Sequence, residues 1–351
     1  MDFKGASGDI RFDSETYTSS IHTTYVHWQI KDGKLTHQNY LSSDGSRRTG
    51  SALAAWNWLV ENPEEDFANE VENKEVGITY PALSDQYAVL IQGSNGWSNY
   101  RHQADVLSVY QMLKKTGYDD DHIILIIDKA LASDSKNPEP GIVRAEDGGK
   151  DLMEGSVIDY DNADLTPADI SNILLAVKTD KTPIVLPKDA EQNVLLFWSG
   201  HGRNRSSNGA DELAWRDANT GQGMTAERLR QTISRMQAEG LYRKMLVLTE
   251  PCFSEAVITP LVGIPGVLAM SSAGTYEQSF ADNWSSELGV WRCDRFSRNL
   301  VTHLTASPSA TYRDLYLYCA QHTLGSHVHI VNSANFGNLY TTTPQEFIEK
   351  R

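Results

Sequence analysis

The sequence has 351 residues, of which 40% are apolar and 22% are charged, a composition typical of a globular chain with a sizeable core. Its net charge of −15 disfavours phosphate-rich partners, so we do not expect it to bind nucleic acid. No apolar run approaches the ~18 residues of a membrane span. The first residues contain no apolar signal core. We nevertheless expect an exported chain (periplasmic, cell-surface or secreted), and we leave its oligomeric state open.

Residues 1–80 predict a small β-rich extension that precedes the main domain. Thr24–Ile30 has the composition of a strand, and Lys31–Lys34 has the Asp-Gly pair of a tight hairpin turn. The segments Phe3–Asp13 and Trp28–Lys34 resemble the closing part of bacterial periplasmic solute-binding domains. That resemblance implies that the chain is the C-terminal part of a longer protein.

Residues 81–351 predict an α/β domain with a mainly parallel sheet. Five continuous apolar runs are typical of strands buried on both faces; they are Tyr87–Gln92, His122–Asp128, Asn193–Trp198, Lys244–Thr249 and Gly266–Met270. Helical patterns lie between or after them, over 99–116, from Thr166, over 224–238 and over 311–323. Alternating strands and helices favour a sandwich with helices on both sides of the sheet. The polar stretch 129–165 predicts a long surface insertion.

Two reactive side chains follow neighbouring runs in the sequence. His201 lies between glycines after the third run, and Cys252 follows the fourth run. Parallel sheets bind ligands beyond the carboxyl ends of their strands, so both side chains are expected at one rim. A helix predicted to begin at Ser254 and a nearby histidine would favour the thiolate. The amides of Gly202 and Cys252 would then hold an oxyanion.

The chemistry of these residues alone leaves a second interpretation open. A cysteine at the end of a strand often only packs in the core, and a His-Gly pair often only forms a turn. The three cysteines, Cys252, Cys293 and Cys319, are too widely spaced for a disulfide framework or a zinc site. The acidic stretch Asp159–Asp164 lacks a bidentate glutamate, and His327 and His329 lack a third ligand. We therefore expect no metal and no cofactor.

A family resemblance decides between these interpretations. The stretch Val89–Val106 resembles the first strand and helix of the legumains, the asparaginyl endopeptidases, and the catalytic subunit of glycosylphosphatidylinositol transamidase carries a related version. Gly117–Ile124, Ser199–Gly202 and Glu250–Cys252 continue the match, which covers roughly residues 86–305. The resemblance implies a caspase-like α/β/α sandwich, a cysteine endopeptidase and, we expect, a bacterial member of the family.

The resemblance also assigns roles around the reactive pair. Cys252 matches the nucleophile, His201 matches the general acid–base, and Asn95 matches the residue that steadies the histidine. The backbone of Gly202 is assigned to the same catalytic group.

For the specificity pocket, Arg101 matches an arginine, Asp294 an aspartate and Ser279 a serine. A cation and an anion that face one another suit an asparagine side chain, whose amide both accepts and donates. Two positions depart from the family. Phe253 stands where legumains have an acidic residue, and Pro251 replaces a small alanine. Phe253 therefore borders the expected substrate site and puts strict asparagine preference in question.

Three functions remain in competition. The first is an endopeptidase that hydrolyses a peptide or protein substrate, with cleavage after asparagine. The second is a transpeptidase or transamidase, in which an amine resolves the same acyl-enzyme. The third is a peptide-binding pseudo-enzyme, which the intact His201 and Cys252 argue against and the departures at Phe253 and Pro251 keep open.

Overall fold

The computed structural model describes residues 2–5, 8–11, 24–31, 34–42, 47–49, 63–71, 78–203, 212–214 and 223–350. The chain divides into two compact units, Met1–Asp66 and Phe67–Arg351. The expected division between residues 80 and 81 into an extension and a peptidase domain stays a prediction, and the units of the structure meet earlier in the chain.

The described part of the N-terminal unit consists mainly of β-strands. Its strands are β1 (Asp2–Gly5), β2 (Gly8–Arg11), β3 (Thr24–Lys31), β4 (Lys34–Ser42) and β5 (Arg47–Thr49). β1 pairs with β2, and β3, β4 and β5 form an antiparallel sheet. Lys31 pairs with Lys34, so the predicted hairpin between β3 and β4 is confirmed.

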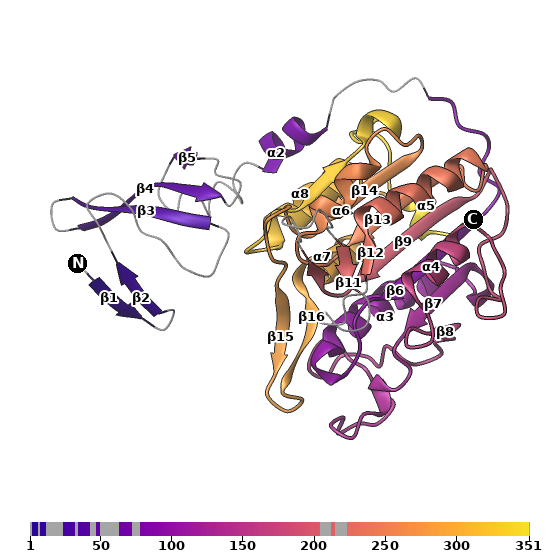
Figure 1. Cartoon of the computed structure of the whole chain (residues 1–351), viewed down its shortest axis with the longest axis horizontal. Coiled ribbons are helices and arrows are strands. Elements are labelled where there is room, and N and C mark those ends of the chain that lie inside the picture. Colours follow the sequence, from indigo (N-terminus) through magenta and orange to yellow (C-terminus); the bar gives the residue numbers. More distant parts are fainter. Residues whose placement is uncertain are drawn as a thin grey trace. The chain divides into compact units, whose positions relative to one another are not determined.

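A seven-stranded sheet organises the second unit (Figure 1). Its spatial order is β17 (His329–Val331), β14 (Val267–Ser271), β13 (Lys244–Thr249), β9 (Asn193–Ser199), β6 (Gln86–Gln92), β7 (Ile123–Ile127) and β8 (Tyr160–Asp161). All neighbours pair in parallel except β14 and β17. The five apolar runs form β6, β7, β9, β13 and β14, so the prediction of a mainly parallel sheet is confirmed.

Helices cover both faces of this sheet. One apolar core includes residues of α3 (Tyr100–Lys115), α7 (Arg295–Ala306), α8 (Tyr312–His322) and α9 (Gln345–Ile348). The other core includes residues of α4 (Pro167–Leu174), α5 (Ala226–Ala238) and α6 (Ser254–Ile258). Successive residues of β6 alternate between the two cores, with Leu90 in the first and Val89 in the second, and both are fully buried. This explains why the strand is apolar at every position, and the α/β/α sandwich is confirmed.

Capping boxes set the starts of two helices. The Thr166 side chain accepts from the Asp169 amide, and the Asp169 carboxylate accepts from the Thr166 amide. Thr311 and Asp314 form the same arrangement at α8. Each cap satisfies backbone donors that the first helical turn leaves unpaired, and is worth about 1 kcal/mol.

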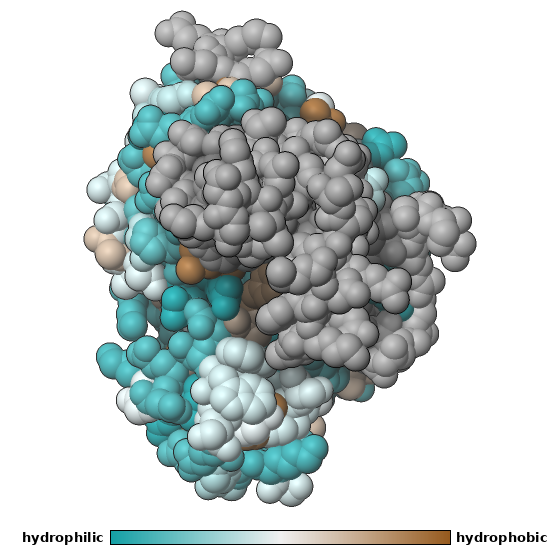
Figure 2. All heavy atoms as spheres, turned by 90° about the vertical axis from the view of Figure 1, so that its left-hand side faces the viewer, coloured by the Kyte–Doolittle hydropathy of each residue, from teal (hydrophilic) through white to brown (hydrophobic). Residues whose placement is uncertain are grey.

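Further elements lie outside the large sheet. They are α2 (Pro63–Glu70), β10 (Gly202–Arg203), β11 (Glu212–Ala214), β12 (Gly223–Thr225), β15 (Ala281–Ser285) and β16 (Val290–Asp294). β15 and β16 form a projecting antiparallel ribbon (Figure 1). Within the predicted insertion 129–165, β8 adds a strand to the sheet edge. Where the described surface is visible in Figure 2, it is mostly hydrophilic, which agrees with the charged composition.

Candidate active site

The segments that carry His201 and Cys252 meet at the carboxyl edge of the sheet. Strands β9 and β13 are neighbours, with Thr249 opposite Trp198, and the two segments follow these strands directly. A Cβ atom placed on Gly202 would lie 1.8 Å from the carbonyl oxygen of Cys252. The two backbones are therefore in contact, and only glycine fits at position 202. The structure brings His201, Gly202 and Cys252 together at one rim.

The histidine segment is also fixed from the β6 side. The His201 amide donates to Ser94 Oγ at 3.0 Å. A Cβ on Gly200 would lie 3.1 Å from Gly93 Cα, tighter than an ordinary contact. The residues on both sides of His201 are thus held between the ends of β6 and β13, which limits the movement of the imidazole.

Asn99, and not Asn95, contacts the imidazole. Asn99 Oδ1 lies 2.8 Å from His201 Nε2. The Asn95 side chain instead donates to Asn162 Oδ1 at 2.7 Å, and its carbonyl accepts from Asn99 Nδ2 at 2.7 Å. The assignment of Asn95 as the residue that steadies His201 was therefore wrong. Asn95 points to the loop before α4, whereas Asn99 precedes α3 and reaches the histidine.

These contacts set the proton position on His201. Because Asn99 Nδ2 donates to the Asn95 carbonyl, the amide oxygen of Asn99 is the atom that faces the imidazole. An oxygen acceptor at Nε2 requires the proton on Nε2 in the neutral ring. Nδ1 then carries the lone pair and is the nitrogen that can accept a proton.

Cys252 has a half-buried thiol beside Ser279. Its Sγ atom lies 3.7 Å from Ser279 Oγ and 3.9 Å from the Ser279 carbonyl oxygen. Burial raises the pKa of this thiol, although the contacts with Ser279 oppose that effect. Helix α6, which begins at Ser254 as predicted, is only five residues long. The direction of this pKa shift is opposite to the expected preference for a thiolate, because burial is its largest cause.

Phe253 follows the thiol in a left-handed conformation. Its φ is +60°, and its amide donates to the Glu277 carbonyl at 2.8 Å. This conformation costs a non-glycine residue roughly 1–2 kcal/mol. The hydrogen bond fixes the turn after Cys252, and the Phe253 side chain is half-buried. Pro251 is buried on the other side of the cysteine.

Arg101 and Asp294 form an ion pair beside the thiol segment. Arg101 Nε lies 3.0 Å from Asp294 Oδ1, and the aspartate side chain is only 4% exposed. His102 Nε2 lies 3.5 Å from Asp294 Oδ2, and the His102 ring is edge-on to His201 with 5.0 Å between centroids. Burial, followed by the charges of Arg101 and His201, holds the pKa of His102 well below its usual value. The neutral form of His102 is therefore favoured, and its ring lies between the ion pair and His201.

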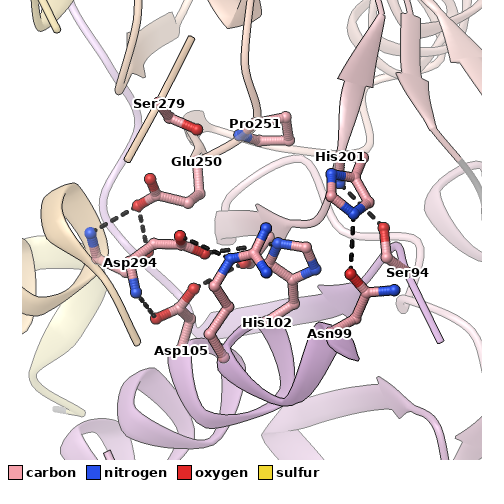
Figure 3. Close-up of polar contacts among 12 residues, drawn as sticks. Ser94, Asn99, His102, Asp105, His201, Glu250, Pro251, Ser279 and Asp294 are labelled. Carbon is pink, nitrogen blue, oxygen red and sulfur yellow. Dashed lines mark hydrogen bonds and ion pairs between the residues drawn. The ribbon is translucent and has the colours of Figure 1, made fainter. Parts of the chain in front are cut away.

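The buried carboxyl groups of Asp105 and Glu250 lie next to Asp294 (Figure 3). Asp105 Oδ1 accepts from the Asp294 amide at 3.0 Å, and Ser199 Oγ donates to Asp105 Oδ2 at 2.8 Å. Glu250 Oε2 accepts from the amide and hydroxyl of Ser297 at 2.7 and 2.6 Å. Burial and the charge of Asp294 raise the pKa of both Asp105 and Glu250 well above the usual carboxyl value. In both groups burial and the nearby charge thus favour the protonated form.

Sequence reasoning missed Asn99, His102, Asp105 and Glu250. The sequence contained a signal for His102 and Asp105. His102 and Asp105 are polar, lie one helical turn apart, and belong to a helix whose other buried residues are mostly apolar. Buried polar side chains on such a face need partners, and here the partners are Asp294 and Ser199.

No metal site accompanies these residues in the described part of the chain. No three His, Cys, Asp or Glu side chains gather there in a way that could hold a metal ion. Among the helices with described residues, none is both long and apolar enough to cross a membrane.

Sequence comparison finds a matching family and several similar proteins. The profile of the Peptidase C13 family matches residues 86–345. A putative GPI-anchor transamidase of Caenorhabditis elegans is 30% identical over 66% of this chain and 70% of its own length. Mouse legumain is 30% identical over 72% of this chain and 58% of its own length. A solved structure of caspase-1 from Spodoptera frugiperda aligns with a TM-score of 0.42 at 10% identity, over 75% of this chain and 93% of that chain.

The match to mouse legumain thus spans little more than half of that relative. The family match, in contrast, covers most of the chain and includes every residue of the site described above. This protein is a member of the Peptidase C13 family, the family of legumain and GPI-anchor transamidase.

Proposed function

We propose that the chain is a cysteine endopeptidase that cleaves peptide bonds after asparagine, with Cys252 as nucleophile and His201 as general base. The observation that supports this most strongly is the contact between the two rim segments, where Gly202 leaves no space for a Cβ against Cys252. Membership of a cysteine peptidase family agrees with this reaction class.

The first step transfers the thiol proton. With the proton of the neutral ring on Nε2, Nδ1 of His201 takes the proton from Cys252 Sγ as the sulfur attacks the substrate carbonyl. A thiol whose pKa is raised by burial needs this base, because little thiolate is present beforehand. The hydrogen bond from Nε2 to Asn99 stabilises the imidazolium that forms.

The second step breaks the peptide bond. A carbon–sulfur bond has formed, and the oxyanion accepts hydrogen bonds from the amides of Gly202 and Cys252. The amine leaves with the proton that His201 Nδ1 releases. Water then attacks the thioester carbon while His201 takes one of its protons. The carbon–sulfur bond breaks, the carboxylic acid leaves, and the proton returns to the sulfur.

Arg101 and Asp294 suit the side chain of asparagine. Arg101 uses Nε for Asp294 and Nη1 for the Ser98 carbonyl, which leaves Nη2 for the carbonyl oxygen of the substrate amide. Asp294 Oδ2 is buried and has no hydrogen bond of ordinary length from the described residues, so it can accept from the substrate NH2 group. A basic side chain would meet Arg101, and an ionised aspartate would meet Asp294. Ser279, the third pocket residue, lies 3.7 Å from the thiol.

The test compares matched peptides that differ only in the residue before the scissile bond. We expect asparagine to exceed lysine and arginine by a factor of roughly 10⁴ in kcat/KM, because the wrong side chain leaves buried polar groups unpaired. Asp294→Asn should reduce this preference, because it removes the charge that accepts from the amide. A preference for lysine or arginine would contradict the assignment of the pocket and leave the Cys252 mechanism intact.

A transamidase reaction is the second candidate, favoured by the name of the nematode relative. The acyl-enzyme is the same, and an amine replaces water in the last step. Adding an amine such as hydroxylamine to the peptide assay separates the two outcomes. Efficient capture of the acyl group by the amine at millimolar concentration favours the transamidase, whereas unchanged hydrolysis favours the peptidase. The expected export of the chain stays a prediction.

A further inference from the structure

The last turn of α2 belongs structurally to the peptidase unit, although it precedes the residues that match the family. Phe67 and Val71 are 1% and 2% exposed and lie in the core that contains α8. The Phe67 ring packs on Tyr316 and Tyr340 with centroids 5.2 and 5.3 Å apart. This segment is therefore anchored by buried apolar side chains.

Glu70, at the end of α2, contacts the edge strand β17. Its Oε1 lies 2.6 Å from His329 Nδ1, and its Oε2 accepts from the Ile330 amide at 2.7 Å. In the described sheet, β17 is an edge strand next to β14. Glu70 thus accepts from a backbone amide, that of Ile330, which no neighbouring strand of this sheet pairs. One carboxylate thus joins α2 to a side chain and to the backbone of the edge strand.

His329 continues the connection toward the active site. Its Nδ1 lies 3.6 Å from Glu255 Oε1, on the helix that follows Cys252. Glu255 Oε2 accepts from the amide and hydroxyl of Thr275 at 2.7 and 2.8 Å. His329 therefore lies between two carboxylates, and one of them holds the segment that leads to Ser279.

Residues 273–280, here called the serine loop, are held mainly by acidic side chains. Glu277 Oε2 accepts from the amides of Gly274 and His327 at 3.1 and 2.9 Å. The Glu277 carbonyl accepts from the Phe253 amide, next to Cys252. Ser279 in the same loop lies 3.7 Å from Cys252 Sγ. A shift of this loop would therefore move both the pocket serine and the turn that carries the thiol.

We propose that Glu70 and His329 are positioning residues that hold the serine loop in place through Glu255. The segment before the peptidase domain thereby acts on the active site without touching substrate. The inference rests on the proposed function, because the loop matters for catalysis only if Cys252 is the nucleophile.

The charge of His329 supports this connection. Burial lowers the pKa of His329, but Glu70, Glu255 and Glu277 outweigh it and raise the pKa to about 9. The groups that face the ring are Glu70 from α2, Glu255 from α6, Glu277 from the serine loop and, with ring centroids 6.3 Å apart, His327. Over the neutral range His329 is a cation between carboxylates, and loss of Glu70 should make that cation easier to deprotonate.

The experiment compares Glu70→Gln with Glu65→Gln, which removes the same charge from an exposed position on the same helix. We expect Glu70→Gln to lower kcat/KM by roughly 2- to 30-fold and to move the alkaline limb of the pH profile to lower pH. Glu65→Gln should behave as the wild type does. The rate of alkylation of Cys252 by iodoacetamide should also change in Glu70→Gln, because the loop contacts the thiol. Thermal unfolding of each variant identifies any that fail to fold.

A double-mutant cycle completes the test. His329→Gln should reproduce the loss seen in Glu70→Gln, and the double variant should lose no more than either single one. Additive losses, or a Glu70→Gln protein with the kinetics, pH profile and alkylation rate of Glu65→Gln, would overturn the inference. A wild type that alkylates at Cys252 and hydrolyses no peptide would instead count against the proposed function, and the alkylation rates would still decide the role of Glu70.

Discussion

Replacing Gly202 by alanine should separate the two catalytic segments. The added Cβ would lie 1.8 Å from the carbonyl oxygen and 2.8 Å from the carbonyl carbon of Cys252. A close carbon–oxygen contact is about 3.3 Å, so the backbones must move apart by roughly 1.5 Å. Both neighbours are backbone atoms, so no flexible side chain can absorb the shift. The displacement falls directly between His201 and Cys252.

The expected magnitude follows from the geometry of proton transfer. A misplacement of 1 Å costs about 10²-fold in rate, so kcat/KM should fall at least that far, or by about 2.7 kcal/mol in transition-state energy. Steady-state hydrolysis of an asparagine peptide measures the loss, and thermal unfolding measures the accompanying cost in stability.

Gly263→Ala is the matched control. Its Cβ would have open space, but its φ of +91° disfavours any side chain. We expect that variant to lose about 1 kcal/mol of stability and to keep its activity. A folded Gly202→Ala protein with kcat/KM within threefold of the wild type would refute the claim that the two segments act together at this contact.

Three further predictions concern the surroundings of the pair. Asn99→Ala should lower kcat roughly 10- to 100-fold because the imidazole loses its orientation, whereas Asn95→Ala should have a smaller effect; equal losses would contradict the assignment of Asn99. The pKa values of Asp105 and Glu250 are raised in the folded protein, so folding favours their protonated forms. Their contribution to the free energy of unfolding is therefore complete below about pH 4, the pKa of an unfolded carboxyl group. It is lost as the pH rises through their pKa values in the folded protein. The melting temperature should therefore fall toward alkaline pH, and less steeply in Asp105→Asn; identical slopes would argue against a protonated Asp105. Treatment with EDTA should leave hydrolysis unchanged, and loss of activity that calcium restores would indicate a structural metal.

Sequence patterns predicted the sheet well because its strands are buried on both faces. The run Lys244–Thr249 coincides with β13, and the other four apolar runs match their strands to within a residue or two at each end. The caps at Thr166 and Thr311 fixed two helix starts, because a threonine followed three positions later by an acid satisfies backbone donors locally. These features depend on short stretches of chain.

Features that depend on contacts between distant segments were harder to predict. The motif around the first helix contains two asparagines, and only the fold shows that Asn162 holds Asn95 while Asn99 faces His201. The raised pKa of the Cys252 thiol was not anticipated, because the sequence does not reveal how deeply the thiol is buried. The position of Asp105 on a buried helix face signals that it needs a partner, but the sequence does not show that the partner is Asp294, which is distant in the chain.

The contact of Glu70 with β17 also depends on segments that are distant in the sequence. Glu70 looks like an ordinary acidic residue at a helix end, and His329 was weighed only as a metal ligand. Their pairing spans more than half of the chain, so no local pattern could indicate it.

The most direct measurement is covalent labelling by a peptide that ends in asparagine and carries a thiol-reactive electrophile, followed by mass spectrometry of the digested protein. The mechanism predicts one adduct per chain, at Cys252, with Cys293 and Cys319 unmodified because both are buried. Labelling should be fast in the folded wild type, much slower in His201→Ala, and absent from Cys252 after denaturation, when selective recognition is lost. Fast labelling at Cys293 or Cys319, or labelling of Cys252 at the same rate in His201→Ala, would contradict the proposed catalytic pair.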